Sequence, residues 1–215
     1  APFGVFALIA KTISSVSGDI SQISEILSAL VFYMGVVILG LFVHMGITYM
    51  TLLKIFTTMD IKHFLKSMAP VQLLGFSTSS SGATLPVTMK RCEKDLGISE
   101  EISSFVLPLG ATINMDGTAL YQGVAAVFIA QAVGMDLTLA NQFTIVATAV
   151  LASIGTAAVP GAGIIMLIII LEAINVPSEG IALILGVDRI LDMIRTATNV
   201  TGDATVASVM DSLER

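Results

Sequence analysis

The sequence predicts an all-α membrane protein. Of its 215 residues, 55% are hydrophobic and only 12% are charged, and the mean hydropathy is +0.93. Soluble domains carry about twice that charged fraction. A second observation is that long uncharged runs are interrupted by glycine, proline and serine, a pattern typical of helices that break inside a membrane protein. The net charge of -6 gives no indication of nucleic-acid binding.

Residues 1–56 are predicted to contain two transmembrane helices. Ile26 to Leu53 is a run of 28 residues without Asp, Glu, Lys or Arg, and at 1.5 Å per residue it crosses a core of about 30 Å with some tilt. Pro2 to Ser15 is interpreted as part or all of another helix. His44 lies inside the longer run, where a packed, neutral histidine is favoured over a proton relay. Because the chain opens on Ala1 without an initiator Met, we expect a piece of a longer membrane protein.

Two later apolar runs are broken in the middle. Ser67 to Met89 is interrupted by the serine-rich tip from Ser77 to Gly82, and Leu137 to Leu171 is interrupted between Ser153 and Gly163. Glycine and proline in mid-run end helices, and the two tips resemble each other. We therefore predict two re-entrant hairpins, at about 60–95 and 138–175, with two kinked spanning helices as the alternative.

The placement of charges predicts how the hairpins face. Six of the ten basic residues flank the first hairpin: Lys54, Lys62, Lys66, Lys90, Arg91 and Lys94. By the positive-inside rule this hairpin opens to the cytoplasm. The second is flanked by Asp136, Glu172 and Glu179, so it is expected to open to the outside, as is the connection from Thr12 to Glu25.

Segments at about 100–135 and 178–212 must then cross the membrane in opposite directions. The sequence thus predicts an inverted repeat of two re-entrant helical hairpins, each followed by a discontinuous transmembrane helix, a construction common in secondary transporters.

Both crossing segments carry polar groups at membrane depth. On the last one, six polar residues fall within an arc of about 100° of a helix: Asp188, Asp192, Arg195, Thr196, Asn199 and Asp203. Between Ile102 and Met135 the only charged residue is Asp116, and Asn114 and Gly117 beside it predict local unwinding. Such groups are costly in lipid and indicate a functional site. Carboxylate, amide and carbonyl oxygens suit a hard cation.

Together these motifs resemble the C-terminal half of the dicarboxylate/amino acid:cation symporter family, which includes archaeal aspartate transporters and excitatory amino acid transporters. The resemblance covers essentially the whole chain. It rests on Asn114 to Thr118, the serine-rich tip, Gly155 to Gly163, and Asp192 to Asp203.

The resemblance implies a multi-pass secondary active transporter of the inner or plasma membrane, a homotrimer when complete, with partners limited to an acidic amino acid and membrane lipid. It implies sodium-coupled symport of glutamate or aspartate by alternating access, with co-transported Na+ ions and no catalytic residues. Residues 1–56 would be two scaffold-type helices, and residues 57–215 the transport core.

The resemblance also implies residue roles. Arg195 would pair with the side-chain carboxylate of the substrate and Asp192 with its ammonium group. The other substrate-binding residues would be Ser79, Ser80, Ser81, Thr118, Val159, Gly163, Thr196 and Asn199. One sodium ion would be bound by Gly110, Asn114, Asn199 and Asp203. A second would lie among backbone oxygens of Thr112, Ser153, Ile154 and Thr156, and a third would use Asn114 and Asp116.

At some positions the sequence departs from the family pattern. Some family members carry an arginine at the position of Thr78 and others at the position of Met193, and this arginine lies near the residue that matches Asp192. Because both positions lack it here, Arg189 is the remaining candidate partner of Asp192. Ala158 replaces a frequent glycine and is expected to stiffen the second tip. Gln122 stands where potassium-countertransporting members carry a glutamate, which favours coupling to sodium alone.

Other functions remain open at this point. A proton- or sodium-coupled symporter of C4-dicarboxylates or neutral amino acids fits the same family, and broken helices also build ion channels. An intramembrane aspartyl protease using Asp116 and Asp203 is disfavoured, because Val200 stands where its Gly-x-Gly-Asp motif needs glycine. The choice between glutamate and aspartate, and the ion stoichiometry, are undetermined.

Overall fold

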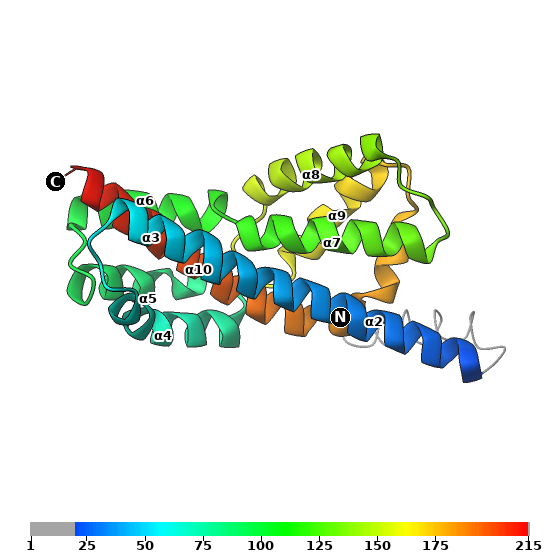
Figure 1. Cartoon of the computed structure of the whole chain (residues 1–215), viewed down its shortest axis with the longest axis horizontal. Helices are drawn as coiled ribbons and strands as arrows, with labels where there is room; N and C mark the ends of the chain where they lie inside the picture. Colours follow the sequence, from blue (N-terminus) through cyan, green and yellow to red (C-terminus); the bar gives the residue numbers. More distant parts are fainter. Residues whose placement is uncertain (1–19, 215) are drawn as a thin grey trace.

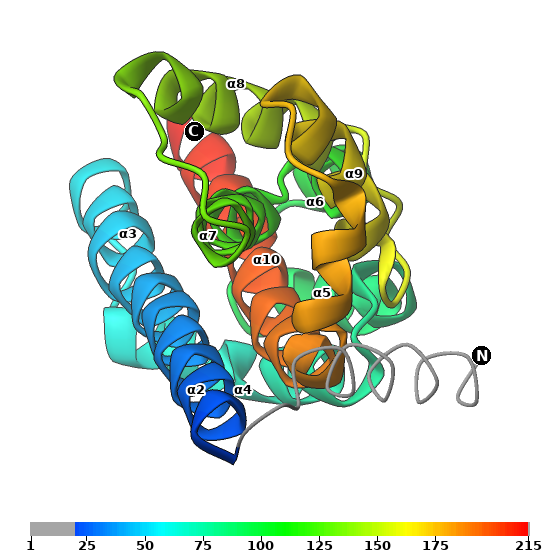
Figure 2. The same cartoon turned by 90° about the vertical axis from the view of Figure 1, so that its right-hand side faces the viewer.

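The computed structural model describes residues 20–214, and within that range the chain is helical with no strand. The predicted helix from Pro2 to Ser15 lies outside the described residues. Figures 1 and 2 show a long helix, α10, running from the C-terminal end through the middle of the molecule, with the other helices packed around it.

The first described helix is a single rod made of three segments. These are α2 (Ile20–Val43), the π-helical turn η1 (His44–Tyr49) and α3 (Met50–Phe56). Within residues 20–214, Ser24–Phe56 is the one stretch long and apolar enough to span a membrane by itself. One face buries Tyr33, Val37 and Leu41, while the opposite face exposes large apolar side chains, including Val31, Phe32 and Leu39. The rod therefore packs on one side and offers an apolar surface on the other.

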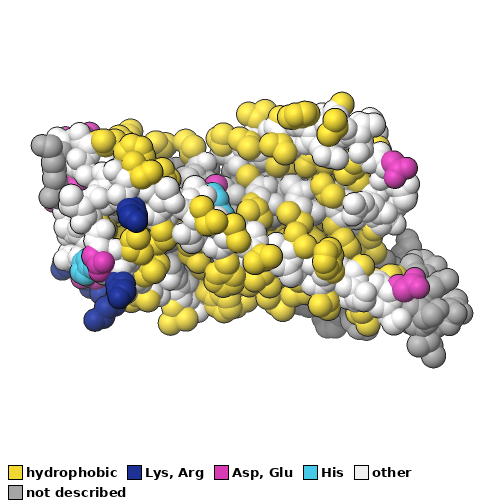
Figure 3. Space-filling view, in the orientation of Figure 1, with side chains coloured by type: hydrophobic (Ala, Val, Ile, Leu, Met, Phe, Trp, Pro, Cys, Tyr) yellow, Lys and Arg dark blue, Asp and Glu magenta, His cyan; other side chains and the backbone are white. Residues whose placement is uncertain are grey.

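Helices α4 (Ile61–Thr78) and α5 (Ser81–Lys94) form the first helix pair. The turn between them is sharp because Ser79 adopts a left-handed conformation with φ 52°. Ser80 caps α5 by accepting a hydrogen bond from the Ala83 amide, as short polar side chains do at helix starts. On the face shown in Figure 3, Lys and Arg gather at the end of the molecule where α3 ends and α4 begins.

The second helix pair consists of α8 (Leu139–Ile154) and α9 (Ala162–Ala173). Helix α8 ends at Gly155, and the chain enters α9 through Gly161, whose φ of 76° is strained for any other residue. The tip between them is irregular.

Between the pairs, α6 (Glu100–Ile113) and α7 (Asp116–Ala132) are separated by a break at Asn114 and Met115, whose backbone angles are not helical. The predicted unwinding beside Asp116 is therefore confirmed. The break exposes backbone groups and places Asp116 at the first position of α7.

The last crossing segment, predicted at about 178–212 as a discontinuous helix, differs from that prediction. A short 3-10 helix, η2 (Ser178–Leu183), precedes α10 (Leu185–Glu214), which is unbroken for 30 residues. Its buried hydroxyl groups donate to backbone carbonyls four residues earlier, so they need no break in the helix to find partners. These residues are Thr196, Thr198, Thr201, Thr205 and Ser208.

Helix α10 joins two apolar cores. One lies among α2, α7, α8 and α9 and includes Leu191, and the other lies among α4, α5 and α6 and includes Val200 and Ala204. The polar face of α10 is consequently enclosed where the two cores meet. This position sets the site described below.

The contact of η2 with α7 gives a stability prediction. A Cβ atom added at Gly180 would lie 2.4 Å from Cγ2 of the buried Ile129, so Gly180→Ala should lower stability by about 1–3 kcal/mol through overpacking. Gly123→Ala is the control, because a Cβ there meets nothing within 4 Å and helical propensity favours alanine. Thermal unfolding in detergent measures both, and equal melting temperatures for the two variants would contradict the packing of η2.

Candidate functional site

The tips of the two helix pairs touch each other above α10. The Ser80 hydroxyl donates to the Ala158 carbonyl over 2.7 Å, and the Gly82 amide donates to the same oxygen over 3.2 Å. The Gly161 amide donates to Oδ2 of Asp192 over 2.9 Å. Three hydrogen bonds thus fasten the second tip to the first tip and to α10.

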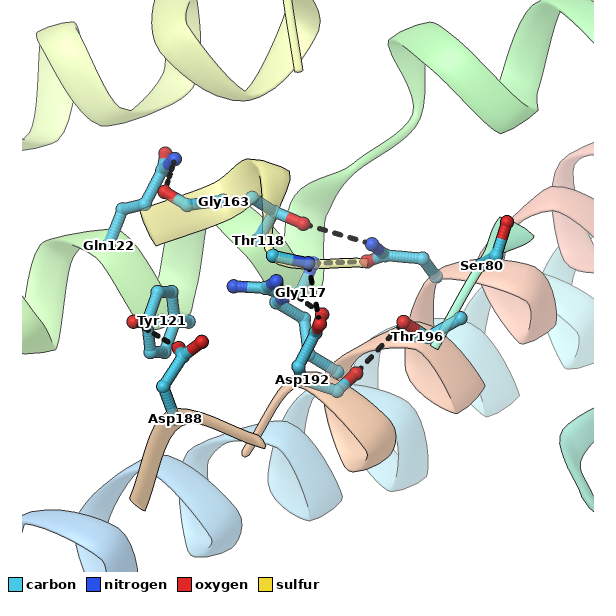
Figure 4. Close-up of polar contacts among 12 residues, drawn as sticks. Ser80, Gly117, Thr118, Tyr121, Gln122, Gly163, Asp188, Asp192 and Thr196 are labelled. Carbon is cyan, nitrogen blue, oxygen red and sulfur yellow. Dashed lines mark hydrogen bonds and ion pairs between the residues drawn. The ribbon is translucent and has the colours of Figure 1, made fainter. Parts of the chain in front are cut away.

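Beneath this contact, Asp192 and Arg195 form a buried ion pair. Nη2 of Arg195 lies 2.5 Å from Oδ1 of Asp192, and each residue is 3% exposed. The guanidinium carbon lies 4.6 Å from the ring centre of Tyr121, a favourable cation–π distance. The Tyr121 hydroxyl donates to Asp188 over 2.6 Å (Figure 4). The negative charge that pairs with the Arg195 guanidinium therefore comes from Asp192, one turn earlier on the same helix.

This pairing answers a question that the sequence left open. Arg189, the candidate partner of Asp192, is exposed, and Arg195 pairs with Asp192 instead. Arg189 lies about 100° around the helix from Asp188 and so leaves the buried polar face.

The Arg195 guanidinium also depends on a glycine. Nη1 of Arg195 is buried without a hydrogen-bond partner, and it would lie 2.3 Å from a Cβ atom at Gly163. Any side chain there would displace the guanidinium. Next to it, Nε2 of the fully buried Gln122 donates to the Gly163 carbonyl over 3.0 Å (Figure 4). Gln122 thus joins α7 to the start of α9, a contact that sequence reasoning did not anticipate.

A small cavity lies between the tips, α7 and α10. Its volume is about 20 Å³, room for about one water molecule. Its lining includes every predicted substrate-binding residue except Ser80, together with Met115, Thr156, Ala157 and Ala158. The Ser79 hydroxyl is buried there without a hydrogen-bond partner. The predicted residues are thus brought together around a cavity that is too small to hold an amino acid.

The first predicted group of cation ligands is assembled at the helix break. Nδ2 of Asn114 donates to Oδ1 of the buried Asp203 over 3.1 Å, and a Cβ at Gly110 would lie 2.7 Å from that same oxygen. The Asn199 side chain bridges to α7, accepting from the Gly117 amide and donating to the Thr118 hydroxyl, each over 3.0 Å. This group is compact, and its carboxylate lies in a buried environment.

Asp116 has two partners that sequence reasoning missed. His44 Nε2 lies 2.7 Å from Oδ2 of Asp116, and the Tyr49 hydroxyl donates to Oδ1 over 2.6 Å. The expectation of a packed histidine therefore missed its specific partner. A signal was present, because a histidine and a tyrosine within an apolar run must find polar partners when they are buried.

The second predicted group is arranged around two helix ends. Thr112 is exposed near the end of α6, and the buried Ser153 and Thr156 lie at the end of α8, where Ile154 exposes its side chain. The hydroxyl groups of Thr112, Ser153 and Thr156 donate to carbonyls three or four residues earlier, so each hydroxyl oxygen keeps lone pairs that can accept, as backbone oxygens do. Helices α6 and α8 contact each other, and helix C-termini carry partial negative charge.

Comparisons with known proteins agree with the sequence motifs. A profile described as the sodium:dicarboxylate symporter family matches residues 1–213. The chain is 41% identical over 215 residues to excitatory amino acid transporter 1 of Rattus norvegicus, covering 100% of this chain and 39% of that protein. It is 43% identical over 215 residues to the proton/sodium-glutamate symport protein of Bacillus subtilis, covering 100% of this chain and 48% of that protein. The chain thus spans less than half the length of these relatives.

The contact between the tips can be tested by cross-linking. A Cβ at Gly82 would lie 3.6 Å from Cβ of Ala158, within the range of disulfides. We expect Gly82→Cys with Ala158→Cys, in a Cys92→Ala background, to form a disulfide on mild oxidation. Peptide mass spectrometry detects it. The control pair is Gly82→Cys with Gly155→Cys, since the nearest atoms to a Cβ at Gly155 belong to Met166 and Ala152. Similar cross-linking of both pairs would contradict this tip geometry.

Proposed function

The chain belongs to the sodium:dicarboxylate symporter family, and we propose that it forms the substrate- and cation-binding core of a transporter that couples uptake of an acidic amino acid to sodium. The observation that carries this proposal is the buried Asp192–Arg195 pair, whose two charges complement those of such a substrate. The names of the relatives, excitatory amino acid transporters and a glutamate symport protein, support it.

In the proposed recognition, the Asp192–Arg195 ion pair is replaced by two ion pairs, one between each residue and the substrate. Separating Asp192 from Arg195 leaves two uncompensated buried charges, and one such charge alone costs about 3–5 kcal/mol. A ligand that carries both an ammonium group and a side-chain carboxylate compensates both charges at once. Its main carboxylate would meet the polar groups that line the rest of the cavity: Ser79, Ser81, Thr118, Thr196 and Asn199.

Charge balance explains the need for cations. Four carboxylates, those of Asp116, Asp188, Asp192 and Asp203, surround the site with Arg195 as the guanidinium among them. An acidic amino acid adds further negative charge, and unpaired charges are costly away from water. Sodium ions at the three predicted ligand groups would offset this excess. Substrate and sodium would then each raise the affinity of the other by the same factor.

The helix lengths support the proposed membrane topology. Helices α8 and α9 have 16 and 12 residues, so at 1.5 Å per residue each is shorter than a core of about 30 Å. In the proposal both pairs are re-entrant hairpins of an inverted repeat, the first opening to the cytoplasm and the second to the outside. The basic residues around α4 and α5 favour that orientation.

The rod formed by α2, η1 and α3 packs along α7 and α10 and bonds to Asp116. This packing favours a place for the rod in the moving core, rather than in the scaffold of residues 1–56 that the sequence predicted. In the proposal the complete protein is a homotrimer. Its transport core, which includes the rod, moves against a scaffold to which the rod does not belong.

The second tip is the proposed gate. Its contacts to Ser80, Gly82 and Asp192 close a cavity too small for an amino acid, so substrate entry requires that they break. An enclosed cavity fits alternating access better than an open pore, which disfavours the channel alternative.

Uptake of radiolabelled aspartate by the complete protein in liposomes tests the function. We expect concentrative uptake under an inward sodium gradient and none when an ionophore dissipates the gradient. We also expect no dependence on internal potassium, because Gln122 stands where potassium-countertransporting members of the family carry a glutamate. Uptake driven by a proton gradient without sodium would contradict the proposed coupling.

The role of Arg195 gives a binding prediction with a matched control. Arg195→Cys should reduce aspartate affinity by about a hundredfold or more, since it removes the partner of a buried charge, and should permit binding of small neutral amino acids such as serine. Arg189→Cys should leave aspartate affinity unchanged because Arg189 is exposed on the same helix. Isothermal titration measures both, and unchanged aspartate affinity in Arg195→Cys would exclude this recognition mode.

A further inference from the structure

The rod at the start of the described chain has one irregular turn, and it faces the cation site. Residues 44–49 form a π-helical turn within an otherwise α-helical rod. Such turns have hydrogen bonds between residues five apart, are rare, and occur frequently at functional sites. On an α-helix, residues five apart point about 140° away from each other. The wider turn instead brings the ring centres of His44 and Tyr49 to 4.8 Å from each other, and the two ring planes meet edge to face at 72°.

Both rings bond to the carboxylate of Asp116, one to each oxygen. His44 Nε2 is 2.7 Å from Oδ2, the Tyr49 hydroxyl is 2.6 Å from Oδ1, and the Gly117 amide also donates to Oδ1 over 2.9 Å. A carboxylate accepts about four hydrogen bonds in all. With three of them supplied by protein groups, the orientation of the carboxylate is fixed and about one acceptor position remains.

The approach of Tyr49 depends on a glycine of α10. A Cβ atom at Gly202 would lie 2.6 Å from the Tyr49 hydroxyl oxygen and 3.2 Å from Nδ2 of Asn114. Tyr49 is 3% exposed and therefore held in place. Its hydroxyl thus lies where the helix break meets α10, beside the Asn114–Asp203 contact.

We propose that this π-helical turn is a positioning device for a cation at Asp116. Tyr49 and His44 are positioning residues that hold the Asp116 carboxylate with its remaining acceptor position toward the ion, and the ion itself contacts neither ring. A carboxylate already fixed in this orientation loses little freedom when the cation binds, so cation affinity is higher. This inference rests on the proposed function, because Asp116 is a cation ligand only if the chain binds sodium.

The test uses the complete protein in detergent and measures aspartate affinity over a range of sodium concentrations. In Tyr49→Phe we expect the half-saturating sodium concentration to rise about tenfold, since one hydrogen bond to a charged group is lost. At saturating sodium, aspartate affinity should stay within about twofold of the unmutated protein, because Tyr49 does not line the substrate cavity.

Further variants separate positioning from general stability. His44→Leu should raise the half-saturating sodium concentration as Tyr49→Phe does. His44→Gln should keep that concentration close to the value of the unmutated protein, because the glutamine amide is also a neutral donor. Thr48→Val is the control, because Thr48 belongs to the same turn but is exposed; its sodium dependence should be unchanged.

The outcomes are distinct. Unchanged or lower half-saturating sodium in both Tyr49→Phe and His44→Leu would overturn the positioning role. So would an equal loss of aspartate affinity at every sodium concentration with a lower melting temperature, which indicates a structural role. If the unmutated protein binds aspartate without any sodium dependence, the proposed function fails, and the inference fails with it.

Discussion

The ion pair between Asp192 and Arg195 is the interaction on which the rest of the site depends. Two opposite charges buried at 3% exposure are tolerated because they are 2.5 Å apart and further bonded. Asp192 also accepts from the Gly161 amide, so the same carboxylate holds the second tip in place. Arg195 in turn requires Gly163 beside it and Tyr121 beneath it. A ligand that separates the pair therefore disturbs both the tip and α10, which gives binding a direct route to movement.

A second set of carboxylates lies below the pair, where α6 and α7 are interrupted. Asp203 bonds to Asn114 and Asp116 bonds to His44 and Tyr49, so residues of three separate helices converge on one break. Asn199 bridges this region to the cavity between the tips through Gly117 and Thr118. Because the carboxylates share their surroundings, neutralising one with a cation changes the electrostatic cost of binding at the others. This arrangement gives a physical basis for the proposed coupling between substrate and ions.

The sequence and the structure differ most at two places, the last helix and the rod. The last helix is continuous although the inverted repeat predicted a discontinuous one. Its hydroxyl groups bond to its own carbonyls, Asp192 and Arg195 pair within the helix, and Asp188 and Asp203 find partners on or beside other helices. The rod from α2 to α3 read as a uniform apolar span, yet it contains a π-helical turn directed at Asp116. In the rod the deciding contacts join residues far apart in the chain, whereas in α10 many of them are local bonds to the preceding turn.

The sequence by itself determined which segments are helical and apolar, that a break occurs beside Asp116, and that one face of the last helix is polar. Those features follow from local properties: helix-breaking residues, hydrophobic runs and the period of the α-helix. Only the tertiary structure decided that Asp192 pairs with Arg195 rather than with Arg189, that His44 and Tyr49 reach Asp116, and that the Ala158 carbonyl receives the first tip. The physical reason is that a buried polar group must find a partner, and which partner it finds is set by the packing of whole helices around α10.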